Sequence, residues 1–138
     1  MLRLQRGLRG EKKMVVKRQD LASYAGNIGA EVLSTHRGVL LMEQAVRNTI
    51  ENFLPEGKIT VGTSISIEHF AATPPGVKVR AEAFLKEING RRLFFDIVVR
   101  DEFEEIARGQ NEQIIVSADR FLETVKQKEA LARTREGA

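Results

Sequence analysis

Three polar side chains stand at positions where the surrounding pattern calls for apolar ones. Glu43 interrupts the apolar face of a predicted helix, Thr35 stands at the start of that helix, and His69 falls in the inward phase of a predicted strand. A buried carboxylate or imidazole costs free energy unless other groups satisfy it. A carboxylate beside an imidazole can also perform acid–base chemistry near neutral pH. The three residues are therefore candidates for a catalytic site.

Each of these residues also has a purely structural explanation. Glu43 can extend outward along the helix or pair with Arg47 on the next turn. His69 can be a hydrogen-bonded core histidine. Thr35 can cap the helix, although Ser34 beside it can cap equally well and leave the threonine hydroxyl free for a ligand. We favour a functional role for Glu43 and His69 because both are expected on packed surfaces that meet.

Three further residues are candidates for substrate binding. Gly62 lies within an otherwise well-filled strand, where a glycine usually marks a bulge or a close approach of another group. Its N–H can polarise a substrate carbonyl, or the glycine only makes room for a neighbour. His36 and Arg37 follow Thr35 directly and can either reach a ligand or face solvent.

The elements that must position these residues follow from hydrophobic periodicity. A short strand is predicted over residues 14–18, and residues 19–33 form a loop or a broken helix. Apolar residues at three- and four-residue steps predict a helix over 34–54. From residue 58 the period is two, with Ile65, Ile67 and His69 in one phase and Gly62 in the other.

The rest of the chain reads as a meander of strands that ends in a helix. A strand over 77–85 leads to Asn89-Gly90, a two-residue hairpin signal in which both residues take positive φ. A strand over 106–117 precedes a terminal helix whose apolar contacts are Phe121, Leu122 and Val125. This order predicts an α+β fold, with an antiparallel sheet curled around one long helix.

Composition indicates a single domain over residues 14–138. The chain has no cysteine and two histidines, which excludes thiolate chemistry and argues against a structural metal site. No apolar run is long enough to span a bilayer and none opens the chain, so we expect a cytoplasmic protein without a membrane partner.

The basic charge is concentrated at the N-terminus. Residues 1–18 hold seven of the 22 basic side chains and one of the 19 acidic ones, which leaves fifteen basic and eighteen acidic side chains elsewhere. Residues 1–13 are expected to be a disordered basic tail. The tail could contact nucleic acid or an anionic surface, but the acidic body argues against a nucleic-acid partner.

Several motifs resemble the hot-dog thioesterases typified by fluoroacetyl-CoA thioesterase. The resemblance covers about residues 14–128 and is carried by the threonine, glutamate and histidine spacing within the same strand and helix order. Its segments are Thr35–Glu43, Thr60–Thr63, His69–Gly76, Asn89–Leu93, Gly109–Glu112 and Phe121–Lys128. One departure is His36-Arg37, where members of the family tend to carry small or apolar residues.

The resemblance implies a hot-dog fold and hydrolysis of a short acyl-CoA thioester without a metal or other cofactor. It implies that Thr35, Glu43 and His69 are the catalytic residues and that the N–H of Gly62 approaches the thioester carbonyl. It further implies a homodimer, or a higher oligomer, with acyl-CoA bound between subunits.

Three other functions are compatible with the same residues. The first is a hot-dog module that binds a CoA ester or a small acyl ligand without turnover. The second is an interaction module driven by the basic tail. The third is a hydratase on the same fold, because a fold does not determine chemistry.

Overall fold

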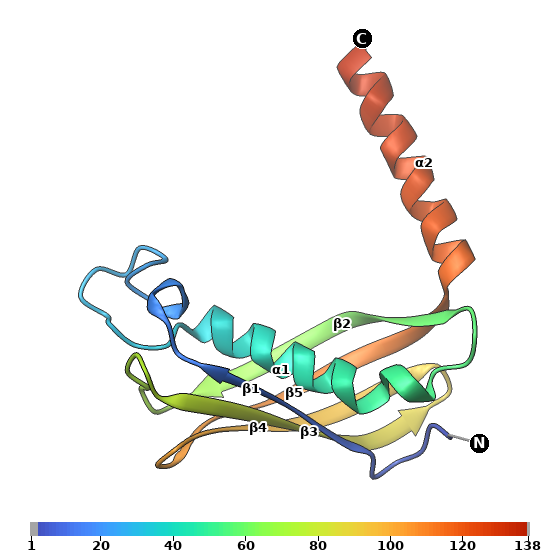
Figure 1. Ribbon diagram of the computed structural model, residues 1–138. Helices are drawn as coiled ribbons and strands as arrows, with labels where there is room; N and C mark the ends of the chain where they lie inside the picture. The colour runs from blue at the N-terminus through green and yellow to red at the C-terminus, as the bar shows by residue number, and fades with distance from the viewer. Residues whose placement is uncertain (1–2, 138) are drawn as a thin grey trace.

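The computed structural model describes residues 3–137, in which a five-stranded antiparallel sheet curls along one long helix (Figure 1). The expected α+β architecture is confirmed. The sheet order is β1-β3-β4-β5-β2, so β1 and β2 form its two edges. The elements are β1 (Arg9–Val15), α1 (Thr35–Ile50), β2 (Lys58–His69), β3 (Lys78–Asn89), β4 (Arg92–Asp101), β5 (Glu105–Ser117) and α2 (Ala118–Gly137), with 3-10 turns at Arg18–Asp20 and Glu51–Phe53.

The core lies between α1 and the concave face of the sheet. Met42, Val46 and Ile50 are buried along one side of the helix, as the periodicity predicts. They face the buried inward residues of β3 and β4, which alternate with outward residues along each strand. Close approach at this interface depends on Gly109 of β5, where a Cβ atom would overlap the Met42 methyl group and the Ser66 carbonyl oxygen.

The N-terminal strand begins earlier than the sequence predicts. β1 pairs with β3 from Arg9 to Val15, so the expectation of a disordered tail is wrong for residues 9–13. The backbone is already attached at Gly7, whose N–H donates to the Leu85 carbonyl at 2.9 Å. The strand was missed because it lies at an edge, and its solvated outer face gives it a polar sequence. Residues 1–2 of the predicted tail lie outside the described residues.

Strand β2 contains a β-bulge that overturns the predicted phase of Gly62. Its register against β5 shifts between Gly62 and Ser64, because Thr63 has no partner in the ladder. A Cβ atom on Gly62 would lie 3.3 Å from the side chain of buried Gln113. The extra residue therefore turns Gly62 to the same concave face as His69, although the two are an odd number of residues apart.

The predictions for the β3–β4 hairpin and for the terminal helix need correction. The hairpin between β3 and β4 is confirmed, but Asn89 pairs with Arg92, so its two loop residues are Gly90 and Arg91. Only Gly90 has a positive φ there, at 62°.

The terminal helix is also confirmed, yet its predicted apolar contacts remain exposed in this chain. Among residues 3–137, no helix has the length and apolar character needed to cross a membrane.

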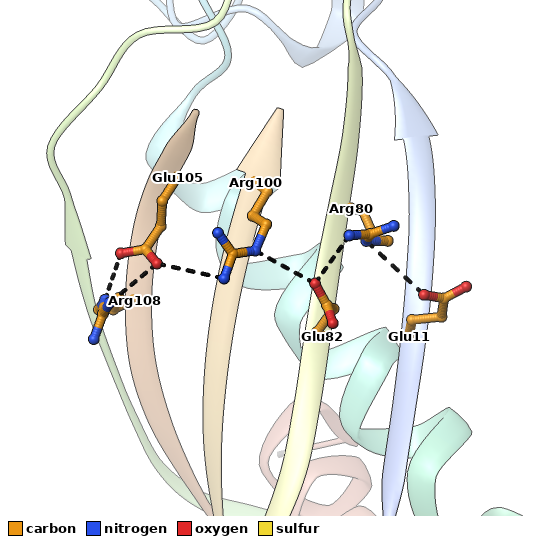
Figure 2. Close-up of polar contacts among 6 residues, drawn as sticks. All are labelled: Glu11, Arg80, Glu82, Arg100, Glu105 and Arg108. Atoms are coloured by element: carbon orange, nitrogen blue, oxygen red, sulfur yellow. Dashed lines mark hydrogen bonds and ion pairs between the residues drawn. The ribbon is translucent and has the colours of Figure 1, made fainter. Parts of the chain in front are cut away.

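The convex face of the sheet carries a chain of ion pairs across four strands (Figure 2). Arg80 contacts Glu11 and Glu82, and Arg100 contacts Glu82 and Glu105. Glu105 also forms a hydrogen-bonded pair with Arg108. This hydrogen bond lowers the pKa of Glu105 and raises that of Arg108. The outer face is thus held by charge, while apolar packing holds the inner face.

Substitution of Gly109 by alanine is expected to destabilise the fold by about 1 to 3 kcal/mol, because the new methyl group overlaps backbone and core atoms. Gly38→Ala is the matched control. A Cβ atom at Gly38, inside α1, would meet Ile67 at an ordinary 3.6 Å, and we expect a gain of about 0.5 to 1 kcal/mol. Urea denaturation measures both values, and equal effects of the two substitutions would contradict the assigned packing.

Substitution of Glu105 by glutamine is expected to lower the thermal midpoint at neutral pH. The folded-state pKa of Glu105 is lowered, so its contribution is present at neutral pH and is lost as pH falls below the ordinary value of 4.5. The difference in thermal midpoint between the variant and wild type should therefore disappear at acidic pH and become smaller at high salt concentration. Exposed Glu104, which lacks this partner, provides the control Glu104→Gln, and an equal pH dependence in both variants would refute the assignment.

Candidate functional site

The start of α1 leaves one hydroxyl free for chemistry. Ser34 is the N-cap, and its Oγ accepts a hydrogen bond from the Arg37 N–H at 3.3 Å. Thr35 is therefore not needed as a cap, and its Oγ1 lies 2.9 Å from Nδ1 of His69 at the end of β2. The chain thus joins a hydroxyl and an imidazole at a helix N-terminus, where unpaired N–H groups favour negative charge.

His69 has one ring nitrogen occupied and the other unoccupied. Nδ1 faces the Thr35 hydroxyl, whereas Nε2 is buried and has no hydrogen-bond partner among the described residues. When Nδ1 accepts the hydroxyl proton, Nε2 carries the ring proton and can give it to another group. A buried nitrogen without a partner is costly in a purely structural histidine, so this arrangement favours a reactive role.

Glu43 lies in a separate small cavity between α1 and the edge of the sheet. The cavity has a volume of about 240 Å³. Gly62 and the side chain of Gln113 form part of its wall beside half-buried Glu43. Within the described chain, no hydrogen bond or ion pair joins Glu43 to Thr35 or His69. The Glu43 carboxylate and the backbone of Gly62 therefore line the same cavity.

A chain of amide groups supports the strand at this cavity. Gln113 Nε2 donates to Asn111 Oδ1 at 2.7 Å, and Asn111 Nδ2 donates to the Ser64 carbonyl oxygen at 2.8 Å. Both amides are buried, and they hold the backbone directly after the bulge. Neither residue was a predicted site residue, although Asn111 lies in the segment Gly109–Glu112 that carries part of the family resemblance. The sequence feature that could have identified them is the occurrence of two amide side chains at inward positions of β5, where the other inward residues are apolar or small.

The other two predicted binding residues, Arg37 and His36, differ in their contacts. Arg37 Nε lies 2.8 Å from Oδ1 of buried Asp20, so this side chain ties the segment before α1 to the helix. Asp20 also accepts a hydrogen bond from the Lys17 N–H, a role that was not predicted from the sequence. His36 is exposed, and its Nε2 lies 3.4 Å from Ser34 Oγ.

Within one chain the candidate residues therefore form two half-sites. Thr35 and Glu43 are eight residues apart on α1, about 12 Å along the helix axis. Gly62 and His69 lie seven residues apart on β2, about 20 Å along the strand when the bulged residue is discounted. One half-site holds the hydroxyl and the imidazole, and the other holds the carboxylate and the glycine.

Other parts of the described chain offer less chemistry. A hollow of about 600 Å³ lies at the ends of β1, β3 and β4, and another of about 610 Å³ lies between β5 and the start of α2. Neither contains any of the candidate residues. In residues 3–137 no three carboxylate, imidazole or thiol groups converge as they would around a metal ion. The two half-sites remain the candidates for catalysis.

Comparisons with known proteins identify the family of the chain. A model of the fluoroacetyl-CoA-specific thioesterase family matches residues 16–119. The fluoroacetyl-CoA thioesterase of Streptantibioticus cattleyicolor is 37% identical over 98 residues, which cover 71% of this chain and 70% of that protein.

Solved structures extend the agreement to the fold. A fluoroacetyl-CoA-specific thioesterase superposes with a TM-score of 0.82 at 30% identity, over 91% of this chain and 97% of that one. A thioesterase superfamily member from Thermus thermophilus gives a TM-score of 0.89 over 97% of this chain and 99% of that one; at 24% identity it supports the fold alone. The chain therefore belongs to the fluoroacetyl-CoA-specific thioesterase family, has the hot-dog fold and is a thioester hydrolase.

Proposed function

We propose that this hydrolase cleaves a short acyl-CoA to the free acid and CoA, and that Thr35, His69, Glu43 and Gly62 carry the reaction. The observation that carries the proposal is the contact between Thr35 and His69, which leaves a buried imidazole nitrogen without a partner. A solved structure of a family member in complex with acetyl-CoA supports this class of substrate.

In the proposed reaction, water and the thioester give a carboxylic acid and a thiol. Glu43 either attacks the thioester carbonyl or removes a proton from the attacking water. His69 delivers a proton to the departing sulfur from Nε2, while Thr35 holds the ring in the required orientation. The N–H of Gly62 donates to the carbonyl oxygen as negative charge develops on it.

A complete site requires a second copy of the chain. The half-sites are too far apart within one subunit, and β2 is an edge strand with no neighbour on its outer side. We infer a homodimer in which β2 pairs antiparallel with the same strand of the partner subunit. Its central residues, including Ser64, Ile65 and Ser66, are exposed in the isolated chain.

The bulge selects a register for this pairing. Residues directly opposite each other in an antiparallel pair face the same side of the sheet. With a two-fold axis at Ser66, the shift at Thr63 puts Gly62 opposite His69 of the partner subunit, and both face the concave side. The carboxylate half-site of one subunit then meets the hydroxyl and imidazole half-site of the other.

The remaining predicted contacts have secondary roles in this proposal. His36 is exposed beside Ser34, and in this proposal it contacts the CoA side of the substrate. Arg37 acts through Asp20 and holds the segment that closes over the acyl group. A higher oligomer, a cytoplasmic location and the absence of nucleic-acid and membrane partners stay predictions from the sequence.

Glu43→Gln and His69→Ala are each expected to lower kcat/KM by about 100-fold or more, because each removes a proton-transferring group or nucleophile. Thiol release from a panel of short acyl-CoA esters measures the effect. Thr35→Val should retain more activity than His69→Ala, since it removes only the orienting hydroxyl.

The matched control for Glu43 is Glu51→Gln, which neutralises an exposed glutamate at the end of the same helix. It should leave kcat/KM unchanged. Wild-type activity in Glu43→Gln would exclude the proposed site, and tight CoA binding without thiol release from any ester would favour a binding module.

Ser66→Cys is expected to give a disulfide-linked dimer on mild oxidation. The chain has no cysteine, and the two Ser66 residues face each other across the proposed axis at a separation that suits a disulfide. The control is Ser64→Cys, which lies opposite Glu68 of the partner subunit and should stay unlinked. Non-reducing electrophoresis measures linkage, and equal linkage of both variants, or of neither, would contradict the register.

A further inference from the structure

The C-terminal helix leaves an apolar surface uncovered. α2 rises from the end of β5 and stands away from the sheet on the same side as α1 (Figure 1). Phe121, Leu122 and Val125 lie on one side of it and are 38%, 53% and 37% exposed. Their spacing is that of a helix that packs against another surface, yet the body of this chain covers them only in part, with Phe121 at a hollow beside Ile115 and Val116.

A second exposed apolar group lies at the other end of the molecule. Tyr24, Ile28 and Phe70 are 65%, 94% and 55% exposed. Phe70 directly follows the catalytic candidate His69, and the other two lie in the segment before α1. That segment is fixed in place, because the Leu33 N–H donates to the Thr73 carbonyl at 2.8 Å and Ser34 N–H donates to Asp20 at 2.9 Å.

These two surfaces cannot meet within one subunit. α2 begins beside Lys58, the first residue of β2, whereas Phe70 follows the last residue of that strand. The twelve residues of β2 extend over about 36 Å. The apolar groups therefore lie at opposite ends of the edge strand.

We propose that Phe121, Leu122 and Val125 of one subunit pack against Tyr24, Ile28 and Phe70 of the partner subunit. The inference rests on the proposed dimer. An antiparallel pairing of β2 about Ser66 reverses one strand, so the end that carries α2 meets the end that carries Phe70 of the partner subunit. A two-fold axis perpendicular to the sheet also keeps both surfaces on the side of α1, where Figure 1 shows α2 and the segment before α1.

This contact would make α2 part of the partner's active site. The segment before α1 is tied to the start of the helix by Arg37 and Asp20, close to Thr35 and His69. A helix resting on that segment lies close to the half-site that holds Thr35 and His69. Each subunit then supplies a wall to the acyl site that contains the imidazole of the other subunit.

Introduced cysteines test this contact in the full-length protein, because the chain has no cysteine of its own. We expect a short bis-maleimide to link the double variant Ile28→Cys/Val125→Cys into a covalent dimer, visible by denaturing electrophoresis. The matched control is Ile28→Cys/Gln127→Cys, whose second cysteine lies on the opposite, polar side of α2 and should link at least five-fold less. A link within one subunit is precluded by the separation of the two ends.

Light scattering and thiol release separate the possible failures. A dimer that hydrolyses acyl-CoA but links no better through residue 125 than through residue 127 overturns the packing of α2 and leaves the proposed function intact. A monomeric protein overturns both the dimer and this contact. A dimer without hydrolysis, but with the expected linkage, supports the contact and overturns the proposed reaction.

Discussion

The arrangement of the site depends on one extra residue in an edge strand. Gly62 and His69 are separated by an odd number of positions, and in a regular strand they would face opposite sides of the sheet. The bulge at Thr63 removes this conflict by turning both residues to the concave face. In the proposed dimer, Gly62 of one subunit and His69 of the partner subunit would then face the same cleft.

The bulge in turn depends on buried amides that the fold must satisfy. Asn111 binds the carbonyl of Ser64, and Gln113 binds Asn111, so neither amide is left without a partner on this side. An unsatisfied buried amide costs about 1 to 3 kcal/mol, enough to favour the bulged register over a regular one. The polar residues of β5 are thus explained by the backbone of β2.

The sequence was most informative where one face of an element is fully buried. The start of α1 and the inward phase of β3 follow from periodicity, since Met42, Val46, Val79 and Leu85 all face the core. The helix was predicted to reach residue 54, but α1 ends at Ile50 and a 3-10 turn follows. The sequence left open whether Ser34 or Thr35 caps the helix; in the structure Ser34 is the cap and the Thr35 hydroxyl contacts His69.

The wrong predictions concern places where burial gives no local signal. β1 is an edge strand whose outer side chains are solvated, and the phase of Gly62 depends on a bulge fixed by side chains about fifty residues later in the chain. The apolar residues of α2 were identified from the sequence. Periodicity shows which face of a helix is apolar, but it does not show which surface packs against that face. Such features are set by tertiary and quaternary contacts.

The exposed edge of β2 also affects how the protein behaves before it assembles. Residues 62–67 include serine, threonine and two isoleucines but no charged residue or proline, so in this segment the bulge at Thr63 is the feature that protects the edge from foreign strands. In a newly made chain this edge can pair with an extended segment of any other chain. Formation of the proposed dimer through β2 therefore competes with aggregation. Expression level and chaperone supply would then govern the yield of active enzyme as strongly as the stability of the folded subunit does.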